Sequence, residues 1–292
     1  MKKIACFVLI LILFSVCACT PVPVDSGGGY NLLASFYPVY IFTLNLIDGI
    51  EGVTLSNMTS GTAGCPHGYS LSQGDMKLLA EADLFIINGA EMELFLEKAL
   101  NNAAGLKIAD SSKGIRLISD DDANEINSHI WMSVPNAIKQ TENIYEALLE
   151  LMPENAELLR ENRDAYVLFL RALHEEIKAA AEGVAGGIIS FHDAYEYFSI
   201  EYNIPFLACI ESHDGGEPTA RELGELKSMI AANNVKALFV EPGYTGAAAS
   251  ILASETEAEI YVLNPVIAGE AVKTAYEDIM RRNIDVLLSV AQ

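Results

Sequence analysis

Residues 153–183, PENAELLRENRDAYVLFLRALHEEIKAAAEG, decide the architecture that the sequence predicts. No glycine or proline interrupts the segment before Gly183, and Pro153 suits the first turn of a helix. Seven apolar residues recur at helical spacing: Leu158, Leu159, Tyr166, Phe169, Leu170, Leu173 and Ile177. About 30 residues at 1.5 Å each span about 45 Å, longer than a typical helix within one α/β lobe. We therefore expect one rigid helix joining two lobes, with two helices separated by a break as the alternative.

Short apolar runs on both sides of this helix predict strands that are buried on both faces, because they are rich in Ile, Val and Phe. The runs occupy residues 30–36, 52–59, 83–89, 186–191, 205–210, 235–240 and 259–265. Strands that alternate with helices indicate parallel sheets flanked by helices. The predicted fold class is therefore α/β, with two lobes of parallel sheets joined by the long helix.

Two helical patterns between the runs are clear. Residues 70–82 should bury one face, formed by Leu71, Met76, Leu79 and Ala80. Residues 217–234 should bury Leu223, Leu226, Met229 and Ile230. Thr219 and Glu222 have the spacing of a capping box, which predicts that this second helix begins just after Thr219.

The first residues predict an exported lipoprotein. Lys2 and Lys3 precede the apolar run 4–16, which is too short to span a bilayer. Cys19 in VCAC is the expected lipidation site, Cys17 is the weaker choice, and an ordinary secretory signal is the alternative. The Pro-, Ser- and Gly-rich residues that follow predict a flexible tether. The expected divisions are 1–18 signal peptide, 19–29 tether, 30–152 first lobe, 153–183 linking helix and 184–292 second lobe.

Charge limits the partners of this 292-residue chain. Loss of residues 1–18 removes two lysines and no acids, so the formal charge moves from −22 to −24. Such a surface repels nucleic acid and attracts cations, although solubility alone also explains most of the acids. Cys65 and Cys209 could pair in an oxidising compartment or remain as buried thiols.

Three of the five histidines occupy positions where a site can form. His67 lies in a loop after a predicted strand, His192 follows the strand run 186–191, and His129 precedes a helix that begins near Pro135. Ligands collect at the carboxyl ends of parallel strands. His174 lies among charges on the long helix and is expected to be solvated. No pair has the short spacing of a helical zinc motif.

Six ordered segments together resemble the metal-specific solute-binding lipoproteins of ABC importers, the ZnuA/TroA-like family. They are ASFYPVY, the run CPHGYS to FLEK, SHIWMSVPNA, SFHDAYEYF, LFVEPGY and LNPV. The resemblance covers about Tyr30 to the end. It implies two α/β lobes bridged by a long helix, with a metal bound in the cleft between them.

The resemblance implies that His67, His129 and His192 are metal ligands. The chain departs from the family at the fourth position, where Asn264 stands in place of the usual aspartate. A neutral amide oxygen is a weak zinc ligand, so water, Glu241 or His213 remain as alternatives, and Cys65 is a further soft candidate. Glu241 could instead be a hydrogen-bond partner of a ligand.

Three imidazoles favour zinc over manganese, which prefers more oxygen ligands. We therefore expect a monomeric extracytoplasmic carrier, anchored to the bacterial membrane by lipid, that captures zinc and passes it to the permease of an ABC importer. An open fourth position also suits a zinc hydrolase with Glu241 or Asp193 as base. A manganese-binding protein or an adhesin of the same fold is a further alternative.

Overall fold

The first lobe is built on a parallel sheet. The computed structural model describes residues 29–60, 69–96, 105–120, 125–184, 187–210, 218–244 and 246–290. The strand order is β2-β1-β3-β4, and every pair is parallel. The strands are β1 (Tyr30–Ala34), β2 (Val53–Asn57), β3 (Leu84–Ile87) and β4 (Lys107–Asp110). The flanking helices are α1 (Tyr37–Leu46), α2 (Gln73–Glu81) and α4 (Val134–Leu151).

A small hairpin and two short 3-10 helices complete the first lobe. The antiparallel hairpin joins β5 (Ser119–Asp120) to β6 (Glu125–Ile126). The 3-10 helices are η2 (Leu94–Leu96) and η3 (Ile130–Met132).

The second lobe repeats the plan with strand order β10-β9-β7-β8, again entirely parallel. Its strands are β7 (Ile188–Ser190), β8 (Phe206–Cys209), β9 (Ala237–Val240) and β10 (Glu259–Val262). Its helices are η5 (Asp193–Tyr195), α6 (Glu196–Tyr202), α7 (Ala220–Ala232), α8 (Ala247–Glu255) and α9 (Ala275–Val290). Thr219 and Glu222 form the expected capping box at the start of α7.

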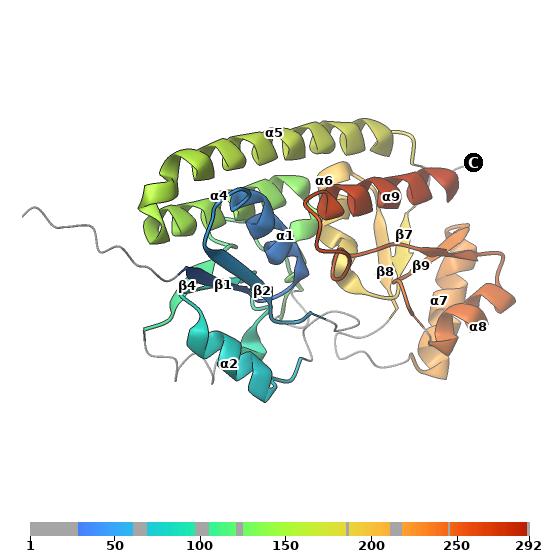
Figure 1. Cartoon of the computed structure of the whole chain (residues 1–292). Helices are drawn as coiled ribbons and strands as arrows, with labels where there is room; N and C mark the ends of the chain where they lie inside the picture. The colour runs from blue at the N-terminus through green and yellow to red at the C-terminus, as the bar shows by residue number, and fades with distance from the viewer. Residues whose placement is uncertain are drawn as a thin grey trace, which may run out of the picture.

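One continuous helix joins the two lobes. After the 3-10 turn η4 (Pro153–Asn155), α5 runs without a break from Ala156 to Ala181. Figure 1 shows it crossing above both lobes, with α4 beneath one end and α9 beneath the other. All seven apolar residues of the pattern lie on α5, which confirms the predicted helix. Phe169 is 41% exposed, and the Arg281 guanidinium lies 5.5 Å from its ring centre.

Side chains of each sheet alternate between two cores, because successive residues of a strand point to opposite faces. In β1, Leu32 joins the core beneath α5 and Leu33 joins a smaller core that includes Leu79 of α2. In β7, Ile188 joins the core beneath α5, whereas Ile189 joins a separate core with α7 and α8. The strands β1, β3, β7 and β9 are therefore buried on both faces, as the apolar runs predict. The prediction was wrong for β10, in which Ile260 and Val262 are 41% and 51% exposed.

The core beneath α5 is continuous between the lobes. It contains Phe42 of α1, Leu170 of α5 and Tyr276 of α9, together with strand residues of both sheets. Hydrogen bonds also cross between the lobes: Trp131 Nε1 donates to the Pro265 carbonyl (2.7 Å), and the Tyr276 hydroxyl donates to the Trp131 carbonyl (2.7 Å). Shared apolar burial and these bonds oppose wide separation of the lobes.

Some sequence-based expectations were wrong or incomplete. Met76 was assigned to the buried face of α2, but it is 44% exposed, and the neighbouring Asp75 is buried because it closes the capping box with Ser72. The strand β4 and the β5–β6 hairpin were not expected. Within the described ranges, no helix is both long enough and apolar enough to cross a membrane.

Candidate metal centre

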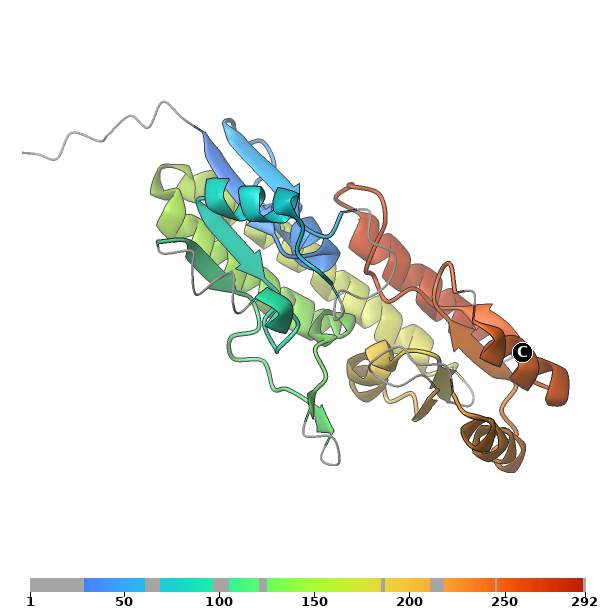
Figure 2. The same cartoon turned by 90° about the horizontal axis from the view of Figure 1, so that it is seen from below.

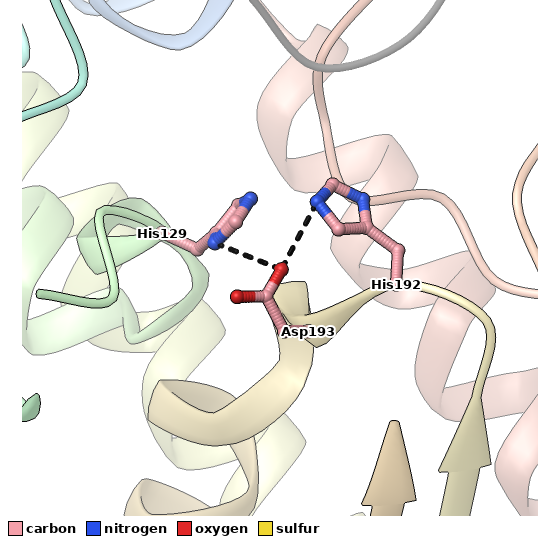
Figure 3. Close-up of side chains that lie close together, drawn as sticks. All are labelled: His129, His192 and Asp193. Carbon is pink, nitrogen blue, oxygen red and sulfur yellow. Dashed lines mark ion pairs between the residues drawn. The ribbon is translucent and has the colours of Figure 1, made fainter. Parts of the chain in front are cut away.

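Two histidines from different lobes meet where the carboxyl end of the second sheet faces the first lobe. His129 directly precedes η3, and His192 lies two residues beyond the end of β7. Their ring centres are 4.6 Å apart and the rings are nearly perpendicular, with an interplanar angle of 84°. Figure 2 shows the lobes side by side, and Figure 3 shows the two imidazoles facing each other across the junction.

Asp193 lies between the two rings. Its Oδ1 atom is 3.2 Å from His192 Nε2 and 3.8 Å from His129 Nδ1, as the dashed lines in Figure 3 mark. One ligand atom from each of these three residues lies within 4.8 Å of the others. His129 is fully buried, whereas the side chains of His192 and Asp193 are 18% and 12% exposed. This set of two imidazoles and one carboxylate has the chemistry and spacing to hold a divalent cation.

Hydrogen bonds determine which His129 nitrogen is available. Asn127 Nδ2 donates to the Asp193 carbonyl (3.0 Å) and to Glu196 Oε2 (3.1 Å), groups that only accept. Asn127 Oδ1 accepts the backbone N–H of His129 (3.0 Å), so the orientation of the amide follows from its neighbours. The same oxygen is 2.9 Å from His129 Nδ1. Nδ1 therefore carries the proton, and Nε2 has the lone pair that a metal requires.

Glu241 determines the corresponding nitrogen of His192. Its carboxylate, one residue after β9, contacts His192 Nδ1, the ring nitrogen opposite the one that faces Asp193. A carboxylate can only accept at this position, so Nδ1 donates, and in the neutral ring Nε2 carries the lone pair. Of the alternatives for Glu241, the geometry matches a hydrogen-bond partner of a ligand.

A buried polar network holds the backbone just before His129. Asn88 Nδ2 donates to the Ser128 carbonyl (2.9 Å), and Gln140 Nε2 donates to Asn88 Oδ1 (2.9 Å). Glu93 accepts the Asn88 backbone N–H (2.7 Å), and burial raises the pKa of its carboxyl to about 7. These bonds place Ser128, and so the His129 loop, relative to the first sheet.

Several predicted site residues lie outside the described residues. These are His67, His213, Cys65 and Cys19. Cys209 ends β8, but its pairing with Cys65 stays a prediction for the same reason.

Asn264 and His174 have structural partners. Asn264 Oδ1 accepts the backbone N–H of Val266 (2.8 Å), and the Asn264 backbone N–H donates to Asn283 Oδ1 (2.9 Å). Asn264 therefore fixes a turn in which Val266 has a positive φ of 60°. The expectation that His174 is solvated was wrong, because its side chain is only 18% exposed and Nδ1 lies 3.3 Å from the Tyr202 hydroxyl.

Sequence reasoning missed Asn127, and it considered Asp193 only as a base and not as a residue that lies beside both histidines. The sequence signal was weak: each polar residue stands within two positions of a candidate histidine. Asn127 and Asp193 reach the site only because their two segments, 66 residues apart in sequence, lie side by side in the fold, as the hydrogen bond from Asn127 to the Asp193 carbonyl shows.

Comparison with known proteins gives a consistent set of relatives. The family model described as ZnuA, Zinc-uptake complex component A periplasmic, matches residues 32–290. The zinc-binding lipoprotein AdcA of Streptococcus pneumoniae is 28% identical over 310 residues, covering 98% of this chain and 60% of AdcA. This chain therefore spans about 60% of the length of AdcA. The high-affinity zinc uptake system protein ZnuA of Bacillus subtilis is 28% identical over 309 residues, covering 97% of this chain and 94% of that protein.

A manganese-binding relative and a solved structure are also similar. The manganese-binding lipoprotein MntA of Halalkalibacterium halodurans is 25% identical over 232 residues, covering 77% of each chain. A crystal structure of ZnuA is 25% identical and superposes with a TM-score of 0.79, covering 89% of this chain and 99% of that one.

Proposed function

The chain belongs to the family of periplasmic zinc-uptake component A proteins, and from this premise we propose that it captures a divalent transition metal, zinc above others, and delivers it to the permease of an ABC importer. The observation that carries the proposal is the pair of buried or nearly buried imidazoles, one from each lobe, with ring centres 4.6 Å apart and a carboxylate between them. A cation bound there becomes part of the contact between the lobes.

We propose His67, His129 and His192 as the imidazole ligands. His129 and His192 are supported by their geometry, because Asn127 and Glu241 hold each Nδ1 and leave each Nε2 as an electron-pair donor. His67 is supported by the resemblance of its loop to the family motif.

Ligand chemistry favours zinc over manganese. Imidazole nitrogens bind zinc in tetrahedral sites at about 2.0 to 2.1 Å, whereas manganese prefers a larger number of oxygen ligands. The zinc-binding names of AdcA and of the Bacillus subtilis protein agree with this choice, although MntA shows that related chains carry manganese names.

We further propose a monomeric carrier without catalytic activity, held outside the cytoplasm by a lipid on Cys19, with lobes at 30–152 and 184–292 about the helix 153–183. Continuous apolar packing beneath α5 supports release of the metal by local loop movement rather than by full separation of the lobes.

The test begins with elemental analysis of protein purified without chelator, followed by competition between zinc and manganese. One zinc per chain, bound more tightly than manganese, is expected. His67→Ala should lower zinc affinity by more than ~100-fold, because loss of a ligand costs more than loss of a hydrogen-bond partner of a ligand. His174→Ala removes a histidine elsewhere and should leave zinc affinity unchanged. If the purified protein contains no stoichiometric metal, metal capture is rejected. If His67→Ala binds zinc with full affinity, His67 is not a ligand. Turnover of an ester or amide substrate would favour a hydrolase.

A further inference from the structure

One segment of the second lobe crosses onto the first. Residues 264–274, which we call the strap, connect β10 to α9 and contain no helix or strand. Figure 1 shows this segment beneath the start of α9, beside α1. We infer that the strap positions His129 for the metal by holding Trp131, and that its attachment to α1 slows release of the metal; this rests on the proposed function.

Hydrogen bonds within the second lobe fix the start of the strap. Asn264 Oδ1 accepts the backbone N–H of Val266 (2.8 Å). The Asn264 backbone N–H donates to Asn283 Oδ1 (2.9 Å), and Asn283 Nδ2 donates back to the Asn264 carbonyl (2.7 Å). Val266 is fully buried with a φ of 60°, a conformation that is costly for a β-branched residue and persists only where its surroundings hold it. The start of the strap is therefore held firmly against α9.

The far end of the strap is attached to α1 of the first lobe. Tyr37 Oη donates to the Glu270 carbonyl (2.6 Å), and Asn45 Nδ2 donates to the Lys273 carbonyl (2.9 Å). Burial raises the pKa of Tyr37 to about 12, so its hydroxyl keeps the proton that it donates. A Cβ atom at Gly269 would lie only 2.5 Å from Tyr37 Oη, so the close approach of the strap to α1 requires glycine.

Trp131 connects the strap to His129. The Trp131 side chain is fully buried, its Nε1 donates to the Pro265 carbonyl of the strap (2.7 Å), and its own carbonyl accepts the Tyr276 hydroxyl (2.7 Å). His129 directly precedes η3, and its ring centre is 5.1 Å from that of Trp131. A shift of the Pro265 carbonyl would leave the buried indole N–H without its acceptor, which is costly. Movement of the strap should therefore displace η3, and the His129 ring with it.

The test changes the strap where it meets α1 and follows the release of zinc, by mixing zinc-loaded protein with excess chelator. Gly269→Ala should push the strap away from Tyr37 and raise the release rate by about 2- to 10-fold, the effect expected from loss of one hydrogen bond. Tyr37→Phe removes only the hydroxyl and should act in the same direction. Tyr261→Phe removes a hydroxyl whose bond to Glu259 is exposed and stays within β10, and should leave the rate unchanged.

A double substitution tests whether the strap acts through Trp131. Trp131→Phe keeps an aromatic ring but removes the indole N–H, so it separates the strap from the His129 loop. Gly269→Ala should therefore have little effect on the release rate when Trp131→Phe is also present. Circular dichroism of the metal-free variants checks folding, and if Gly269→Ala does not fold, Tyr37→Phe takes its place in this comparison.

Two results would overturn the inference. One is an equal effect of Gly269→Ala with and without Trp131→Phe, because the strap would then not act through Trp131. The other is a wild-type release rate in both Gly269→Ala and Tyr37→Phe. Failure of the wild type to bind zinc would instead overturn the proposed function.

Discussion

The two halves of the proposed metal centre differ in burial and in charge. The His129 half is fully buried, and its backbone is held mainly by amides, namely Asn127 and the Asn88–Gln140 pair behind Ser128. The one carboxyl in this network, Glu93, has a pKa raised to about 7 by burial. The His192 half is partly exposed and is bordered by two carboxylates, Glu241 on one ring nitrogen and Asp193 near the other. The first lobe supplies fixed geometry, and the second supplies negative charge.

This difference follows from the cost of burial. A carboxylate without a cation is expensive in a dry interior, so charges belong on the half that retains contact with water. An amide can be buried at low cost when its oxygen and nitrogen both form hydrogen bonds, as those of Asn127 do. We therefore expect a cation to be attracted mainly by the second lobe and to be held in place mainly by the first.

The largest expected effects come from the two histidines. His129→Ala and His192→Ala should each lower zinc affinity by more than ~100-fold, since each removes a ligand rather than a ligand's partner. Their effects on the metal-free protein should differ. His129→Ala leaves a buried space and an Asn127 oxygen with one partner fewer, so it should cost about 1 to 3 kcal/mol of unfolding free energy.

His192→Ala removes a partly exposed ring and should cost less than ~1 kcal/mol. Chelator competition measures the affinities, and denaturant unfolding of the metal-free variants measures the stabilities. Equal destabilisation by the two substitutions would mean that the halves do not differ in packing.

The fold was more predictable than the site. Apolar runs identified seven strands of the two sheets, and the signal is clearest for β3, β7 and β9, because a strand buried on both faces needs apolar residues at nearly every position. The strand β4 was not predicted because its sequence, KIAD, is polar at both ends and has only two apolar residues, of which Ile108 is exposed. Phe169 and Met76 show that an apolar residue on a helix need not be buried. The Arg281 guanidinium lies over the Phe169 ring, and Asp75 is buried in place of its neighbour Met76.

The site was only partly predictable, because its chemistry depends on contacts across the chain. His129 and His192 could be nominated from their loops and from the family resemblance. The tautomer of His129 depends on Asn127, whose orientation is fixed by the Asp193 carbonyl of the other lobe. The partner of His192, Glu241, lies 49 residues away. The bond from Asn127 to Asp193 arises only when the two lobes are assembled, and the contact of Glu241 with His192 requires the folded second lobe. No local sequence pattern encodes either contact.

A second prediction tests the anionic half directly. Glu241→Gln keeps an acceptor near His192 Nδ1 but removes the charge, and should lower zinc affinity by about 10- to 100-fold. Glu259→Gln makes the same change at an exposed residue of β10 and should have no effect. Competition titration measures both variants. If Glu241→Gln binds zinc as wild type does, negative charge beside His192 does not contribute to capture.

The smallest effect on binding is expected from an acid that lies away from both halves. Glu277 of α9 is 1% exposed, and burial raises the pKa of its carboxyl from 4.5 to about 7. The nearby guanidinium of Arg281 is already paired with Glu176 (2.9 Å), so it lowers the pKa of Glu277 only weakly. Unlike Asp193 and Glu241, this carboxyl has no imidazole beside it in the described structure and is expected to hold a proton instead.

The sign of the pH effect follows from that raised pKa. Between pH 4.5 and about 7 the folded protein holds the Glu277 proton more tightly than the unfolded chain does, so this group destabilises the fold progressively as pH rises through the interval. Glu277→Gln removes the titration and should be more stable than wild type at pH 8 by on the order of 1 to 3 kcal/mol, with the difference shrinking towards pH 5. Urea unfolding of the metal-free proteins at several pH values measures it, and zinc affinity should not change. If the stability difference between Glu277→Gln and wild type stays constant between pH 5 and pH 8, Glu277 is ionised in the folded protein. The second lobe would then bury a negative charge away from His192 as well as beside it.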